Sequence, residues 1–148
     1  MVAVLLAGAL ASALPAAEPR GLVRLPSGRV LSVEIADTPI EREVGYMNRE
    51  RIADDEGMVF LQETLGFHYF WMKNCKVSLD IVWLDETWRV VHIERNLPPC
   101  SPEPEAVCPH YTSMQASRHA LEVRGGLTGV DGLKVGDVIV FSPPPATR

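Results

Sequence analysis

Four residues could take part in chemistry near the end of one strand-like stretch. Trp71, Lys73 and Asn74 fall within FWMKNC (70–75), and Asp80 begins the next apolar run. A lysine at a half-buried strand end could have a lowered pKa and act as a base, with Asp80 orienting or neutralising it. Alternatively, Lys73 and Asp80 form a structural ion pair and Asn74 caps a turn through its side chain.

The same residues could instead bind a ligand without reacting with it. Apolar and aromatic walls with a few fixed polar groups are typical of small-molecule, sugar and peptide sites. Tyr69, Trp71 and Trp83 would supply the rings, although burial in a core also explains aromatic residues in a small domain. The chain carries no nucleophile elbow, HExxH, Walker loop or paired-carboxylate spacing. We therefore expect a non-enzymatic binding or accessory module, with a hydrolase-type enzyme using Lys73, Asn74 and Asp80 as the alternative.

Soft side chains suggest a third function, copper binding. Sulfur and imidazole ligands suit Cu(I) in an exported protein. The candidates are Met47, Met58, Met72, His68, His92 and Cys75. No M-x-x-M or H-x-H cluster groups them, and Met at helix or strand spacing normally fills a core. The sequence thus predicts neither a metal site nor a cofactor, and copper binding stays an alternative.

The N-terminal run predicts export. Residues 1–17 carry no charged side chain and are mostly Ala, Leu or Val, which resembles the apolar part and cleavage region of a signal peptide. No Lys or Arg precedes the run, and an uncleaved anchor is the alternative, although a spanning helix needs about 20 apolar residues. We expect a periplasmic or secreted protein with one globular domain over 18–142 and a tail over 143–148.

Cysteine usage fits an oxidising compartment. Cys100 and Cys108 lie in NLPPCSPEPEAVCPHY, a Pro-rich acidic loop with no hydrophobic pattern of its own. A disulfide between them would fasten this loop and contribute roughly 2–3 kcal/mol on a chain-entropy argument. Cys75 is then left over, either as a small buried apolar side chain or as a reactive thiol or metal ligand.

Charge and composition limit the classes of partner that we expect this protein to bind. The 148 residues are 47% hydrophobic with a formal net charge of −5, which suits one compact domain. Nucleic-acid binders normally show a basic patch, so the acidity argues against that class. We expect a monomer whose partner is a small polar ligand, a glycan or an envelope protein.

The sequence predicts that most elements that position these residues are strands. Alternation and turn residues predict strands over 21–25, 29–36, 58–61, 67–74, 118–123 and 137–141 and a hairpin over 80–95. In the second of these, Leu31, Val33 and Ile35 form the buried face. Thr38, Pro39 and Glu41 predict a capped helix over 39–49, and a short turn or helix is expected over 127–132. The predicted fold is mainly β, at the margin of α+β: a compact antiparallel sandwich or barrel with one or two short helices.

The strand over 67–74 has two largely apolar faces. His68, Phe70, Met72 and Asn74 project one way, and Tyr69, Trp71 and Lys73 project the other way. We therefore expect a central strand that is covered on both sides, with Lys73 and Asn74 where it leaves the core.

Several blocks together resemble a known family. GYMNR (45–49), DEGMVF (55–60), FWMKN (70–74), LD (79–80), VVHIERNLPPC (90–100) and GVDGLKVGD (129–137) are similar, in order and spacing, to the domain of unknown function 192 family, also called uncharacterised protein family 0127. The resemblance covers roughly 28–142. It implies a compact mainly-β fold and frequent export from bacterial and archaeal cells, but no established activity. The chain has Cys75 where the family usually has Thr, and Ser78 where it usually has Pro.

Overall fold

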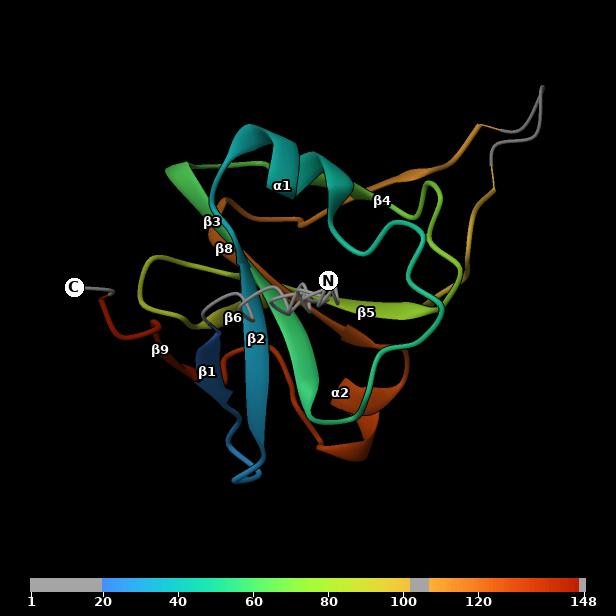
Figure 1. Cartoon of the computed structure of the whole chain (residues 1–148). Helices are drawn as coiled ribbons and strands as arrows, with labels where there is room; N and C mark the ends of the chain where they lie inside the picture. The colour runs from blue at the N-terminus through green and yellow to red at the C-terminus, as the bar shows by residue number, and fades with distance from the viewer. Residues whose placement is uncertain (1–19, 102–106, 147–148) are drawn as a thin grey trace, which may run out of the picture.

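The computed structural model describes residues 20–101 and 107–146, and the predicted signal peptide at 1–17 lies outside them. The described part is mainly β, as predicted (Figure 1). The strands are β1 (Gly21–Arg24), β2 (Val30–Ala36), β3 (Glu56–Gly66), β4 (Tyr69–Trp71), β5 (Leu79–Leu84), β6 (Val90–Leu97), β7 (His110–Thr112), β8 (Ser117–Arg124) and β9 (Val140–Ser142); the helices are α1 (Pro39–Val44) and α2 (Leu127–Val130). Among these residues, no helix is long and apolar enough to cross a membrane.

One large sheet organises the chain. Its strand order is β6-β5-β8-β3-β2-β1-β9, while β4 and β7 form a separate two-stranded sheet. Neighbouring strands are antiparallel except for β2 and β3, which are parallel because the chain between them crosses over through α1. Figure 1 shows α1 and β4 toward one end of the large sheet and α2 toward the other.

The sheet curls so that its two edges approach each other. Val90, at the start of edge strand β6, donates from its backbone N–H to the carbonyl of Asp137 at 2.8 Å. Ile139 donates to the carbonyl of Trp88 at 3.1 Å, and the next residues along the chain form β9, which pairs with β1. Backbone bonds therefore connect both edges and give the sheet the character of a barrel.

Each face of the sheet packs against its own core. The inner core contains Val23, Leu31, Val33, Val59, Val82, Leu84, Leu121 and Val123, all almost fully buried. A second core on the other face contains Met58, Phe60, Ile81, Trp83 and Ala120, covered by Tyr46, Phe70, Met72 and Cys75. Residues of β3, β5 and β8 alternate between the two cores, so these central strands are buried on both sides.

The predicted hairpin over 80–95 and the predicted buried face of the strand over 29–36 are confirmed. Strands β5 and β6 pair around the turn at Asp85, whose Oδ1 accepts the Thr87 N–H at 2.8 Å and the Arg89 N–H at 3.0 Å. Leu31 and Val33 are fully buried in the inner core, and Ile35 packs against it partly buried.

The first helix is shorter than the predicted range of 39–49. Its capping box forms as expected, with the Glu41 N–H donating to Thr38 Oγ1 at 3.2 Å and Glu41 Oε2 accepting the Thr38 N–H at 2.9 Å. It ends at Val44 because Gly45 has a φ of 44°, which is outside the helical range. Ile40 on the apolar face of α1 is 74% exposed, so this face is not buried in the described structure.

The prediction of a central strand over 67–74 is wrong. Only Tyr69–Trp71 form a strand, β4, and it pairs with β7 outside the large sheet. The backbone carbonyl of His68 accepts a hydrogen bond from Trp83 Nε1 at 3.1 Å, a side-chain partner in place of a neighbouring strand. Phe70 and Met72 are buried on one side, whereas Tyr69 on the other side is 67% exposed. The stretch covers the second core as an outer layer.

Candidate functional site

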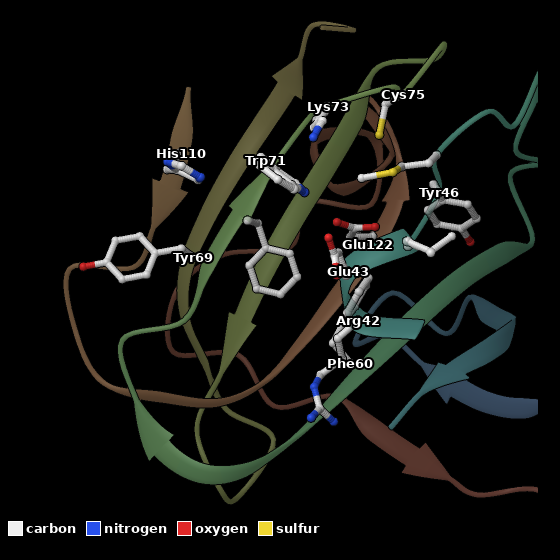
Figure 2. A pocket seen from close by; sticks show the side chains of 14 residues that line it. Arg42, Glu43, Tyr46, Phe60, Tyr69, Trp71, Lys73, Cys75, His110 and Glu122 are labelled. Atoms are coloured by element: carbon white, nitrogen blue, oxygen red, sulfur yellow. The ribbon is translucent and has the colours of Figure 1, made fainter. Parts of the chain in front are cut away.

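A pocket of about 260 Å³ lies between the end of α1, strand β4 and the middle of β8 (Figure 2). The large sheet forms its floor, where Phe60 of β3 and Glu122 of β8 face the second core. Phe70 and Trp71 of β4 form one wall, and the residues after α1 form the other. With His110 of β7, the pocket therefore collects residues from five segments of the sequence.

A buried carboxyl group lies at the floor of this pocket. Glu122 is only 4% exposed, and its register partners on the neighbouring strands are Met58 of β3 and Ile81 of β5. Its Oε2 is fully buried and has no hydrogen-bond partner among the described residues. Burial raises the pKa of Glu122 from its ordinary value to about 8, because desolvation disfavours the charged form. At pH 7 the carboxyl group is therefore mostly protonated.

Two neutral groups face Glu122 from the wall. The turn at Gly45 brings Tyr46 into the second core, where it is 3% exposed and its hydroxyl has no hydrogen-bond partner in the described part of the chain. Burial raises the pKa of the Tyr46 phenol, and the charge of Glu122 adds to this shift. Burial likewise raises the pKa of the free Cys75 thiol to about 12. Both groups are uncharged at physiological pH, and Cys75 is not a ready nucleophile.

An aromatic and cationic cluster forms another part of the pocket lining. Trp71 and His110 are opposite each other in the β4–β7 pairing, and their rings stack at 5.5 Å between centroids. Lys73 Nζ lies 4.7 Å from the centroid of the Trp71 ring, a cation–π contact. The protein thus already provides a cation for the Trp71 ring.

Two charged side chains from α1 also line the pocket. Arg42 points away from Glu122 in Figure 2, and its Nη1 donates to the backbone carbonyls of Asp37 at 2.5 Å and Leu61 at 3.0 Å. Glu43 extends toward the middle of the pocket and makes no hydrogen bond or ion pair with any residue that the structure describes. Arg42 therefore has hydrogen-bond partners and Lys73 has a cation–π contact, whereas the buried Oε2 of Glu122 has no partner among the described residues and Glu43 is exposed.

Of the four residues predicted for the site, the structure brings Trp71 and Lys73 into this pocket. Asn74 does not line it. The φ of Asn74 is 57°, a left-handed conformation that Asn tolerates, and its backbone N–H donates to the carbonyl of Cys100 at 2.8 Å. Its carbonyl accepts from the Asn48 N–H at 2.8 Å, so Asn74 joins two loops.

Asp80 is fully buried away from the pocket. Its Oδ1 accepts the N–H groups of Asn96 at 2.8 Å and Gly126 at 2.7 Å. Its Oδ2 accepts the N–H and Oγ1–H of Thr128 at 2.9 Å and 2.6 Å. In the described residues no ion pair joins Lys73 and Asp80, so the alternative that they form one is wrong. Asp80 instead connects α2 and β6 to β5 through its hydrogen bonds.

The disulfide between Cys100 and Cys108 is present, as predicted. The two histidines among the soft side chains have other neighbours: His92 Nε2 lies 3.0 Å from Glu94 Oε1, and His68 Nε2 lies 2.9 Å from the Thr64 carbonyl. Met58, Met72 and Cys75 pack together in the second core, and Met47 and Cys75 line the pocket. Within residues 20–101 and 107–146, no three His, Cys, Asp or Glu side chains are grouped as a metal site.

Sequence reasoning missed Glu122 and Tyr46. The strand predicted over 118–123 is confirmed as β8, and a glutamate between Leu121 and Val123 is the available signal. If that strand is central, Glu122 must be buried whichever face it occupies. This signal can be used only when the strand is known to be central. The periodicity of apolar residues does not give the order of the strands in the sheet.

The chain belongs to the DUF192 family, whose model, described as Uncharacterized ACR, matches residues 23–141. The family resemblance is thereby confirmed. No curated protein matches the chain.

Two solved structures share this fold. One is a protein of unknown function from Novosphingobium aromaticivorans DSM 12444, 31% identical, with a TM-score of 0.73; the match covers 87% of this chain and 94% of that one. The other, from Sinorhizobium meliloti 1021, is described as a "putative transcription regulator"; it is 30% identical, with a TM-score of 0.70 and coverage of 83% and 92%.

Proposed function

We propose that the protein is an exported binding module of the cell envelope that holds a small polar molecule in the pocket above Glu122. The buried Oε2 of Glu122 carries this proposal, because a buried polar atom without a partner is costly and is rare in folded proteins. A ligand that hydrogen-bonds this atom removes that cost. The aromatic walls around a few polar groups suit such a ligand.

Export is the second part of the proposal. Its support is the uncharged apolar run at 1–17 and the Cys100–Cys108 disulfide, since disulfides persist mainly in oxidising compartments. The Sinorhizobium protein is described as a "putative transcription regulator", a class whose members commonly bind DNA. The net charge of −5 in this chain does not favour that function.

Native mass spectrometry of protein produced in a bacterial host with its own N-terminal run tests both parts. We expect a chain that lacks the apolar run, is two hydrogens lighter than its fully reduced form, and retains a small molecule. A Glu122→Gln variant should lose that molecule, whereas Glu86→Gln in the exposed β5–β6 turn should keep it. Retention by both variants would contradict the pocket assignment.

A second candidate is an enzyme in which Glu122 transfers a proton. A carboxylic acid with a raised pKa inside a pocket is a typical general acid or base. Turnover of the retained molecule, with a rate that follows the titration of Glu122, would favour this candidate over binding alone. Lys73, Asn74 and Asp80 are not assembled as a group in this arrangement, because Asp80 accepts hydrogen bonds from Asn96, Gly126 and Thr128 away from the pocket.

A further inference from the structure

We infer that the ligand of this pocket carries a protonated amine, and that its binding releases the proton of Glu122. This inference rests on the proposed binding function and deepens it. It starts from the buried Oε2 of Glu122 at the floor of the pocket, which has no hydrogen-bond partner among the described residues. The buried Tyr46 hydroxyl also lacks a partner there, and Glu43 is an exposed carboxylate of the same lining. An ionised carboxyl group at the position of Glu122 needs a hydrogen-bond donor and positive charge beside it, and a ligand with an ammonium group supplies both.

The cations of the pocket do not supply a donor to Glu122. Arg42 donates to two backbone carbonyls, and Lys73 lies over Trp71. Neither makes an ion pair within the described residues, and Arg42 points away from Glu122 in Figure 2. An anionic ligand at the Lys73 ammonium group would oppose the ionisation of Glu122 and would supply no donor to its Oε2.

The surroundings of Glu122 explain why its carboxyl group is protonated when no ligand is bound. From the neighbouring strands it faces Met58 and Ile81, and from the wall it faces the neutral Tyr46 and Cys75. No described cation contacts it. An isolated carboxylate in such surroundings is strongly disfavoured, so its pKa rises to about 8.

A bound ammonium group favours the ionised form of Glu122. Its N–H donors would satisfy Oε2, and its charge would stabilise the carboxylate over the acid. The aromatic faces of Phe60 and Phe70, which contact each other edge to face at 5.0 Å, suit the apolar part of the molecule. The ligand enters already protonated, the carboxylic acid becomes a carboxylate, and its proton goes to the solvent.

Titration calorimetry on the full folded protein tests this, with benzylamine as the probe and benzyl alcohol and benzoate as its neutral and anionic counterparts. At pH 6.5, measurements in buffers of different ionisation enthalpy should give close to one proton released per benzylamine bound. The affinity should rise about tenfold per pH unit between pH 6 and 7.5 and level off above about pH 8, the pKa of Glu122 without a ligand.

Variants distinguish Glu122 from other titrating groups. Glu122→Gln should abolish the proton release and weaken benzylamine binding at least tenfold at pH 8, whereas Glu86→Gln should change neither. The proton count on the unsubstituted protein tests the inference even if Glu122→Gln does not fold. Benzylamine binding without proton release would overturn the role of Glu122.

Different results of this experiment contradict the inference and the proposed function. If benzoate or benzyl alcohol binds and benzylamine does not, the ammonium assignment is wrong and the pocket remains a ligand site. If none of the three probes binds and the purified protein carries no molecule, both the assignment and the proposed function are overturned.

Discussion

Gly45 at the end of α1 and Glu122 in the middle of β8 meet at the pocket. A Cβ added to Gly45 would lie 3.6 Å from Glu122 Oε2 and 3.3 Å from Phe60 Cζ. The backbone of Gly45 also has a φ of 44°. The glycine thus performs two tasks: it ends the helix and leaves room above the buried carboxyl group.

The first prediction concerns this contact. Gly45→Ala should lower the free energy of unfolding by about 1–2 kcal/mol, because alanine resists a positive φ and its methyl group approaches Phe60 closely. It should also reduce ligand affinity by narrowing the pocket. Chemical denaturation measures the first effect and calorimetry the second. Gly132→Ala is the matched control, since Gly132 has a φ of 65° with open space around it; equal losses of affinity would contradict the pocket contact.

The second prediction concerns stability and pH. The folded-state pKa of Glu122 is raised to about 8 from 4.5, so the folded protein binds more protons than the unfolded chain between these values. This contribution to stability is fully present below about pH 4.5 and is lost as the pH rises toward 8, by at most about 5 kcal/mol.

Glu122→Gln removes this titration and should unfold at a higher denaturant concentration than the unsubstituted protein at pH 8. Denaturation of both proteins at pH 5, 6.5 and 8 measures the difference, and other titrating groups cancel in the comparison. A difference that stays constant across these pH values would show that Glu122 does not titrate as described.

The third prediction concerns Asp80. Asp80→Ala should destabilise the fold by about 3 kcal/mol or more, because three backbone N–H groups and the buried Thr128 hydroxyl lose their acceptor. Asp55→Asn, at an exposed position, should change stability by less than about 0.5 kcal/mol. Thermal and denaturant unfolding measure both. If Asp80→Ala leaves stability intact but abolishes ligand binding, Asp80 is a site residue after all.

The fourth prediction concerns Lys73. Lys73→Met should cost no more than about 1 kcal/mol of stability, because Lys73 makes a cation–π contact with Trp71 and no ion pair in the described structure. Benzylamine affinity should stay equal or rise slightly, since a positive charge leaves the pocket. Calorimetry and denaturation test this. A large loss of benzylamine affinity would mean that Lys73 contacts the ligand directly.

The fifth prediction concerns the thiols. Cys75 is the free cysteine and is 7% exposed, with its pKa raised to about 12. Iodoacetamide at pH 8 should therefore label no thiol in the folded protein and one thiol after unfolding without reductant. Labelling is counted by intact mass. Rapid labelling of the folded protein would contradict both the burial and the pKa of Cys75.

The sequence alone determined the classes of element and several of their local details. Alternation of apolar residues identified the β5–β6 hairpin, and Thr38 and Glu41 identified the start of α1, because capping and pairing signals act between near neighbours. Cys100 and Cys108 were identified as a disulfide pair for the same reason. Trp71 and Lys73 were noticed as unusual neighbours of an apolar strand.

Only the tertiary structure decided what these residues face. Strand order placed Glu122 between Met58 and Ile81, and the crossover through α1 brought Gly45 and Tyr46 above it. Period-two alternation shows which residues share a face, but not which strands become neighbours. Asp80 illustrates the limit: its four hydrogen bonds join segments that the sequence keeps far apart, so its structural role was visible only after folding.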